Sequence, residues 1–218
     1  MDELQVYDNS LTGDIPNTLG ELSSLQQFVV SENSLYGTLP SQLGNLMLLE
    51  YFEVFENYLS GPFPSELANW ENMMQLVAFN NFFTQSIPEA IGQQNRLQYL
   101  ELDTNYLSGA LSPSLFELPA IIELGVYSNL ISSSLPSAIG SATTLRYLLL
   151  FENSFTGTIP TEIGLLTALN QLYLFENSLT GVIPTSVEGL RDIEYLQLYS
   201  NSLVGSIPAG LGNLQVFY

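Results

Sequence analysis

A 24-residue period runs through the whole chain of 218 residues and constrains its fold more than any other feature. Asn recurs at this spacing, without one insertion or deletion, at Asn9, Asn33, Asn57, Asn81, Asn105, Asn129, Asn153, Asn177 and Asn201. One unit of this length cannot bury its apolar residues alone, but stacked units share a continuous core. We therefore predict a single solenoid domain of nine units over residues 1–218.

Within each unit the apolar residues predict one short strand followed by a coil. Apolar residues stand five and three positions before each Asn, as Leu100 and Leu102 do before Asn105. This alternation is typical of a strand with one buried face. Further apolar residues follow each Asn by two, six and ten positions, which suits a coil that turns back over the strand. Stacking then places the strands side by side in one parallel sheet.

The repeated polar residues also have structural roles. The turn after each strand leaves buried backbone N–H and C=O groups, and an Asn side-chain amide serves both kinds. Gly stands four positions after most of the Asn residues and Pro seven positions after, where they fix a tight turn. The middle units depart from this pattern, because Gln85 and Ser133 replace Gly and Ser112 replaces Pro.

Composition limits the classes of partner and of chemistry. Charged residues make up only 11% of the chain, yet 22 acids face three bases, which gives a net charge of -19. Such a field opposes nucleic acid and anionic membranes and favours basic partners. The chain has no Cys and no His, which excludes disulfides, thiolate or imidazole metal sites, and Ser-His or Cys-His catalysis. No apolar run approaches the roughly 20 residues that span a bilayer.

Written as L-x-x-L-x-x-L-x-L-x-x-N-x-L-x-G-x-I-P-x-x-L-G-x-L, the units resemble the plant-type leucine-rich repeat over the whole chain. The resemblance implies a right-handed superhelix of the α/β solenoid class, with a parallel sheet on the concave face and irregular or 3₁₀ turns on the convex face. It also implies a non-catalytic module that recognises peptides, hormones or proteins, as receptor-like kinase ectodomains and polygalacturonase inhibitors do, and an extracellular location. The flanking caps of that family are absent, so we interpret the chain as a fragment.

Two sets of side chains are expected on the concave face, because strand residues alternate between the core and solvent. Seven of the nine residues that stand two before the Asn are aromatic. These are Tyr7, Phe55, Phe79, Tyr127, Phe151, Phe175 and Tyr199. A second partial line consists of Tyr51, Tyr99, Tyr147 and Tyr195, with Tyr173 beside it. Exposed aromatic area of this extent indicates a binding surface, although the rings could also stack on one another and stabilise the sheet.

Acidic residues share this face. Our candidate ligand-binding acids are Glu53, Glu56, Glu101, Asp103, Glu123, Glu152 and Glu176. We expect Glu101, Asp103 and Glu123 to converge from adjacent strands as a solvated acidic patch. A Ca²⁺ site there would need six to eight oxygens, and a glycosidase would need a carboxylate pair in a closed pocket. We assign no metal ligand, cofactor or catalytic residue.

We therefore predict that the concave face binds a peptide or protein ligand, more readily a basic one, and makes no direct contact with a membrane. Two alternatives remain open. One is a structural or adhesive surface protein that binds polysaccharide or an ordered surface, and the other is a Ca²⁺-dependent binding module. Aromatic side chains suit several of these ligands, so the residues alone do not name one.

Overall fold

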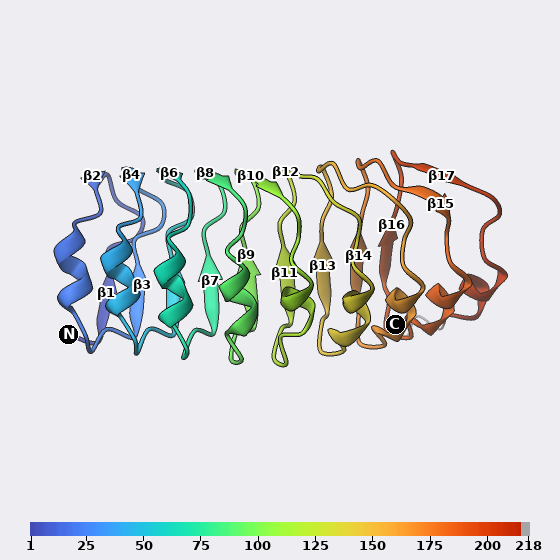
Figure 1. The fold of residues 1–218 in the computed structure, drawn as a ribbon, viewed down its shortest axis with the longest axis horizontal. Helices are drawn as coiled ribbons and strands as arrows, with labels where there is room; N and C mark the ends of the chain where they lie inside the picture. The colour runs from blue at the N-terminus through green and yellow to red at the C-terminus, as the bar shows by residue number, and fades with distance from the viewer. Residues whose placement is uncertain (215–218) are drawn as a thin grey trace.

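The computed structural model describes residues 1–214, so residues 215–218 of the predicted domain lie outside the described residues. Nine short strands, one from each repeat, pair in parallel and in chain order into a single sheet (Figure 1). They are β1 (Glu3–Gln5), β3 (Gln27–Val29), β5 (Tyr51–Glu53), β7 (Gln75–Val77), β9 (Tyr99–Glu101), β11 (Glu123–Gly125), β13 (Tyr147–Leu149), β14 (Gln171–Tyr173) and β16 (Tyr195–Gln197). The predicted parallel sheet of the solenoid is confirmed.

A second set of strands follows the Asn of most repeats along the upper edge of the view in Figure 1. Six of them form one parallel sheet and two more form a separate pair. The six are β2 (Thr12–Asp14), β4 (Ser34–Thr38), β6 (Tyr58–Gly61), β8 (Phe82–Gln85), β10 (Tyr106–Gly109) and β12 (Leu130–Ile131); the pair is β15 (Thr180–Val182) and β17 (Ser202–Val204). We call the six-stranded sheet the lateral sheet.

The return segment of each repeat contains one short 3₁₀ helix, which covers the side opposite the nine-stranded sheet (Figure 1). The helices are η1 (Asn17–Glu21), η2 (Ser41–Asn45), η3 (Ser65–Asn69), η4 (Glu89–Gln93), η5 (Pro113–Phe116), η6 (Ser137–Ser141), η7 (Thr161–Leu165), η8 (Thr185–Gly189) and η9 (Ala209–Asn213). Pro directly precedes most of them, as Pro40 does with φ −69°, because its fixed φ suits the entry to a helical turn. The expected 3₁₀ turns are confirmed.

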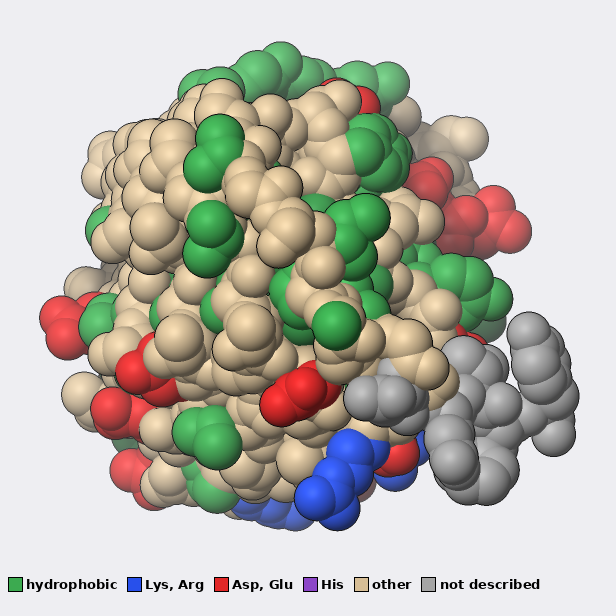
Figure 2. All heavy atoms as spheres, turned by 90° about the vertical axis from the view of Figure 1, so that its right-hand side faces the viewer, with side chains coloured by type: hydrophobic (Ala, Val, Ile, Leu, Met, Phe, Trp, Pro, Cys, Tyr) green, Lys and Arg blue, Asp and Glu red, His purple; other side chains and the backbone are tan. Residues whose placement is uncertain are grey.

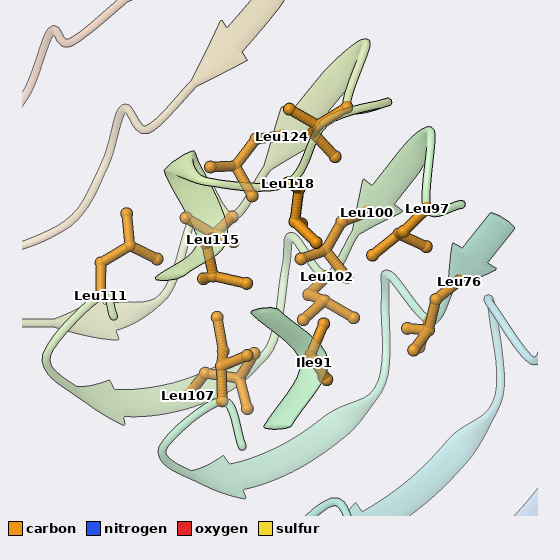
Figure 3. Close-up of a cluster of buried hydrophobic side chains, with 14 of the residues drawn as sticks. Leu76, Ile91, Leu97, Leu100, Leu102, Leu107, Leu111, Leu115, Leu118 and Leu124 are labelled. Carbon is orange, nitrogen blue, oxygen red and sulfur yellow. The ribbon is translucent and has the colours of Figure 1, made fainter. Parts of the chain in front are cut away.

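The core is one continuous column of side chains between the sheet and the helices. Leu76, Leu100 and Leu124 are partners on adjacent strands, and all three are at most 1% exposed. Figure 3 shows these leucines in one cluster with Leu107 from strand β10 and Leu115 from helix η5. The apolar side chains of each repeat thus pack against those of the adjacent repeats. Burying one leucine in this way stabilises the fold by about 2 kcal/mol.

The Asn side chains form a hydrogen-bonded ladder between repeats, as predicted. The Asn57 Nδ2 donates to the carbonyls of Val30, Val54 and Phe55 at 3.1, 3.2 and 3.2 Å, and its Oδ1 accepts from the Leu35 N–H at 2.9 Å. Equivalent bonds are made by Asn33, Asn81, Asn105, Asn129, Asn153, Asn177 and Asn201. Each amide therefore satisfies backbone groups of its own repeat and of the preceding one.

Left-handed backbone occurs at two places in the repeat. The Gly four after the Asn has positive φ, for example 78° at Gly61, which confirms the expected turn. Gln85 adopts φ 67° at the equivalent position, whereas Ser133 does not adopt a left-handed φ. The residue directly before each Asn also has φ between 48° and 53°, although none of these nine residues is Gly.

Within residues 1–214 no helix has the length and apolar character needed to cross a membrane.

Candidate functional site

The concave face is the solvent side of the nine-stranded sheet, and six of the seven aromatic residues that stand two before an Asn lie in two separate stacks. Phe55 and Phe79 form a pair with ring centroids 4.5 Å apart. The longer stack, which we call the C-terminal stack, consists of Tyr127, Phe151, Phe175 and Tyr199, with successive centroids 4.2, 4.3 and 4.4 Å apart. Interplanar angles of 11° to 16° show that the rings lie face to face. Mutual stacking is therefore part of the role of this column.

Stacking covers some side chains that were predicted to be exposed. Phe175 is only 9% exposed because Phe151 and Tyr199 lie against its two faces, so the exposure predicted for this column does not hold at Phe175, and the stacking alternative does. At the ends of the column the rings remain accessible, with Tyr199 54% exposed and Tyr7 53% exposed. The accessible aromatic area is thus the edge of a stack rather than a row of free faces.

The second aromatic line is discontinuous. Tyr51, Tyr99, Tyr147 and Tyr195 lie on alternate strands, and Gln or Glu residues occupy the same register between them. Tyr173 instead packs against the C-terminal stack, with its ring centroid 6.2 Å from Phe151 and 6.1 Å from Phe175. Only this tyrosine of the second group therefore extends the stack.

Three predicted acids come together in the gap between the two stacks. Asp103 occupies the aromatic column between Phe79 and Tyr127, while Glu101 and Glu123 lie on the paired strands β9 and β11. We call Glu101, Asp103 and Glu123 the acidic cluster. Gly125 lies beside Glu101 in the register, and a Cβ placed there would meet no atom closer than the Asp103 Oδ1 and the Leu100 carbonyl, both at 3.9 Å. Gly125 therefore leaves space beside Glu101 that a side chain would otherwise occupy.

Burial and mutual repulsion perturb these carboxyls. Burial, followed by the charges of Glu123, Asp103 and Glu53, raises the pKa of Glu101 to about 7. Burial also raises the pKa of Glu123, with a further contribution from Asp103. A solvated acidic patch was expected, and this was wrong for Asp103, which is 4% exposed. Burial raises its pKa in spite of the nearby Tyr127 hydroxyl and a hydrogen bond from the Thr104 hydroxyl at 3.3 Å.

The remaining predicted acids lie at the edge of this surface. Glu53 is half-buried on β5, and burial raises its pKa. Glu56, Glu152 and Glu176 are exposed and directly precede an Asn of the ladder, where the left-handed backbone fixes their position. Among residues 1–214, no group of three or more acids is placed to hold a metal ion, so the Ca²⁺ alternative gains no support from the geometry.

Sequence analysis missed a further group of aromatic residues on the lateral sheet. Tyr58, Phe82 and Tyr106 directly follow the Asn of three successive repeats and are 57%, 41% and 51% exposed. Their ring centroids are 6.1 and 6.0 Å apart, with interplanar angles of 14°. The repeats themselves indicate this group, because the residue directly after the Asn is Ser in five other repeats and aromatic in these three.

Comparison with known proteins identifies the repeat. A family model described as Leucine Rich Repeat matches residues 144–166 and 192–214. In the comparison with curated proteins, no sequence matched.

Solved structures resemble the chain over nearly its full length. The plant peptide hormone receptor RGFR1, in complex with RGF2, is 36% identical over 92% of this chain, with a TM-score of 0.91. The Arabidopsis receptor kinase HAESA, in complex with the peptide hormone IDA and the co-receptor SERK1, is 30% identical over 98%, with a TM-score of 0.92. This chain spans 32% and 36% of those two chains.

A plant ice-binding protein also matches, with 21% identity over 95% of this chain and 74% of its own, and a TM-score of 0.73. An identity this low shows a shared fold alone. Together, the repeat pattern, the Asn ladder and the similarity to receptor ectodomains show that the chain is a leucine-rich repeat protein of the plant type.

Proposed function

We propose that the concave face is a non-catalytic recognition surface that binds a peptide or a flexible protein segment and takes up a basic side chain at the acidic cluster. The observation that carries this proposal is a set of partly buried carboxyls without a neighbouring base, next to the C-terminal stack. RGFR1 and HAESA, which share this fold, are known in complexes with RGF2 and with the peptide hormone IDA.

Electrostatics favours a cationic ligand group at this place. Each carboxylate of the acidic cluster is destabilised by burial, and two of them are destabilised further by their neighbours. An Arg or Lys side chain of a ligand would replace this repulsion by attraction in a poorly hydrated site. Arg96 does not serve this purpose, because its guanidinium lies 4.0 Å from Glu50 and donates to Asn72 at 3.0 Å.

The aromatic stack supplies a complementary apolar surface. Tyr127 belongs to both parts of the site, since its hydroxyl lies close enough to Asp103 to lower the pKa of that carboxyl and its ring stacks on Phe151. A ligand that places a cation at the carboxyls therefore brings its next residues over the ring edges. Aromatic side chains contribute large contact area with little loss of conformational entropy.

Receptor ectodomains face the outside of the cell, and we extend that location to this chain. The proposed ligand is then a secreted peptide or the exposed part of a surface protein, and the whole chain acts through binding rather than catalysis.

The test is calorimetric titration of two peptide pools of equal length, one basic and one acidic, into the wild type and into Glu101→Gln/Glu123→Gln. We expect binding of the basic pool only, weakened at least tenfold in the double variant and weakened by salt. The matched control is Glu66→Gln/Glu89→Gln on helices η3 and η4, which removes the same charge from the opposite side of the solenoid.

The pH dependence of peptide affinity provides a second test. Because the pKa of Glu101 is about 7, protonation below that pH removes one carboxylate, and affinity for the basic pool should fall as the pH decreases through 7. Equal affinity for both pools, or equal loss in the two double variants, would contradict the proposal. The adhesive alternative would then be favoured.

A further inference from the structure

The lateral sheet carries an exposed apolar surface that is separate from the concave face. Its outward side chains Tyr36, Tyr58, Phe82, Tyr106 and Leu130 come from the adjacent strands β4, β6, β8, β10 and β12. We call these five residues the lateral strip. They are between 41% and 57% exposed. Figure 2 shows hydrophobic side chains gathered along the upper edge of the molecule, where Figure 1 places these strands.

Mutual packing does not account for the lateral strip. Centroids of Tyr58, Phe82 and Tyr106 are 6.1 and 6.0 Å apart, compared with 4.2 to 4.5 Å in the concave stacks. At the shorter distance Phe175 is covered on both faces, whereas at the longer distance each lateral ring stays about half exposed. The lateral rings are thus more accessible than Phe175 in the interior of the C-terminal stack.

The fold does not require aromatic residues at these positions. The residue directly after the Asn is Ser in five of the nine repeats, namely Ser10, Ser34, Ser154, Ser178 and Ser202. The Asn ladder is the same in both kinds of repeat, since Asn57 beside Tyr58 and Asn177 beside Ser178 make equivalent bonds. Large exposed apolar side chains that the scaffold does not need indicate a contact with another molecule.

Two hollows border the strip where it meets the carboxyl ends of the main strands. The first, of about 400 Å³, is lined by Glu32, Asn33, Glu56, Asn57, Tyr58 and Asn80. The second, of about 230 Å³, is lined by Asn80, Asn81, Thr104, Asn105, Tyr106 and Ser128. The first hollow therefore contains two carboxylates beside a tyrosine ring, and the second contains only neutral polar groups beside another tyrosine.

The two carboxylates of the first hollow favour a positively charged side chain there. Glu32 and Glu56 directly precede their ladder Asn, where φ values of 53° and 51° hold them at the rim. The basic side chains visible in Figure 2 lie at the bottom of the molecule, away from the lateral sheet. An arginine fits this hollow better than a lysine, because its planar guanidinium can stack on Tyr58 while it donates two parallel hydrogen bonds to a carboxylate.

The spacing of the hollows suits an extended chain. Tyr58 and Tyr106 lie two strands apart, which corresponds to about 10 Å at the usual strand separation. A segment in the polyproline II conformation rises about 3.1 Å per residue with three residues per turn, so side chains three positions apart lie on the same face about 9 Å apart. One such segment can thus fill both hollows while its backbone passes over Phe82.

We propose that the lateral strip binds a segment of a partner protein in the extended polyproline II conformation, in which an arginine enters the hollow beside Tyr58 and a neutral polar residue three positions away enters the hollow beside Tyr106. This surface lies on the lateral sheet and goes beyond the peptide site proposed for the concave face.

The experiment uses a six-residue peptide, acetyl-Gly-Arg-Leu-Leu-Asn-Gly-amide, titrated into isotopically labelled protein and followed by amide chemical shifts. The test variant is Tyr58→Ser/Phe82→Ser/Tyr106→Ser, which introduces the residue that five repeats already carry. A second variant, Glu32→Gln/Glu56→Gln, is matched by Glu152→Gln/Glu176→Gln at the equivalent positions beside Ser154 and Ser178. A peptide with citrulline in place of Arg keeps the shape without the charge.

We expect shifts in β6, β8 and β10, an affinity loss of at least tenfold in the triple serine variant, and a several-fold loss in Glu32→Gln/Glu56→Gln but not in its matched control. Equal binding of the citrulline peptide, or stronger binding of a neutral oligosaccharide than of the peptide, overturns the inference. So does the absence of measurable binding. Loss only in Glu101→Gln/Glu123→Gln also overturns it while leaving the concave-face proposal in place.

Discussion

At the scale of single residues, the Asn side chain decides whether successive repeats can stack. Its short amide reaches backbone carbonyls of two repeats and accepts from an N–H of the preceding one. Asp at this position would lose the donor and bury a charge, and Leu would leave the backbone groups unpaired. The Asn recurs because no other side chain offers both functions at this length.

We predict that Asn57→Ala lowers the free energy of unfolding by about 3 kcal/mol, because the buried Leu35 N–H and Val30 carbonyl lose their partner. Urea denaturation measures this. Asn9→Ala is the control, since the Asn9 amide donates to Val6 and Tyr7 of its own repeat and should cost about 1 kcal/mol. Equal losses in the two variants would mean that contacts between repeats add nothing.

Gln85 offers a second test at this scale. It adopts φ 67° where other repeats have Gly, so Gln85→Gly should stabilise the protein by about 1 kcal/mol through relief of backbone strain. Ser133→Gly occupies the equivalent position without a left-handed φ and should destabilise by about 0.5 to 1 kcal/mol, because Gly loses more backbone entropy on folding. Melting curves of the two variants should therefore shift in opposite directions.

At the scale of elements, the lateral sheet ends where the repeat pattern is broken. β12 has only two residues, and beyond it the isolated bridges Ser134↔Thr156 and Thr158↔Thr180 replace continuous strand pairing. Ser133 follows β12 and lacks the turn that Gly makes elsewhere. The irregular middle units seen in the sequence therefore limit the lateral sheet to the first six repeats.

The acidic cluster on strands β9 and β11 predicts how the stability of the fold depends on pH. The pKa of Glu101 is raised from 4.5 to about 7, so the folded state binds more protons than the unfolded state between these values. Stability therefore falls as the pH rises from 4.5 to 7. Glu101→Gln should flatten this decline in denaturation experiments, and Glu89→Gln on η4 should not. A decline unchanged by Glu101→Gln would mean that Glu101 keeps an ordinary pKa in the folded protein.

Comparison of the sequence with the structure shows which structural features the 24-residue repeat predicts and which it does not. The strands, the Asn ladder and the 3₁₀ turns follow from residues that each repeat places in the same environment. Exposure on the concave face depends instead on side chains of adjacent repeats. Phe175 is covered because both neighbours are aromatic, and Asp103 is buried although it stands in a column expected to face solvent. Such coverage is visible only once the registers and side-chain directions are known.

At the scale of the whole molecule, the net charge of -19 acts on stability through repulsion over the entire surface. We predict that the melting temperature rises when NaCl increases from about 10 mM to about 150 mM at neutral pH, because the screening length falls from about 30 Å to about 8 Å. At a pH near the pI of about 4.1 most of this effect should disappear. A salt response of equal size at both pH values would point to a cause other than charge screening.

The constant 24-residue register also has a consequence for how such a chain can change over generations. The ladder bonds of each repeat reach back only to the preceding one. The contact surface between two successive repeats is therefore similar wherever it occurs along the chain. Unequal recombination between repeats in a gene would remove or duplicate a whole unit and still join matching surfaces. The concave and lateral surfaces could then be moved, multiplied or separated as blocks, without a new solution to the folding problem.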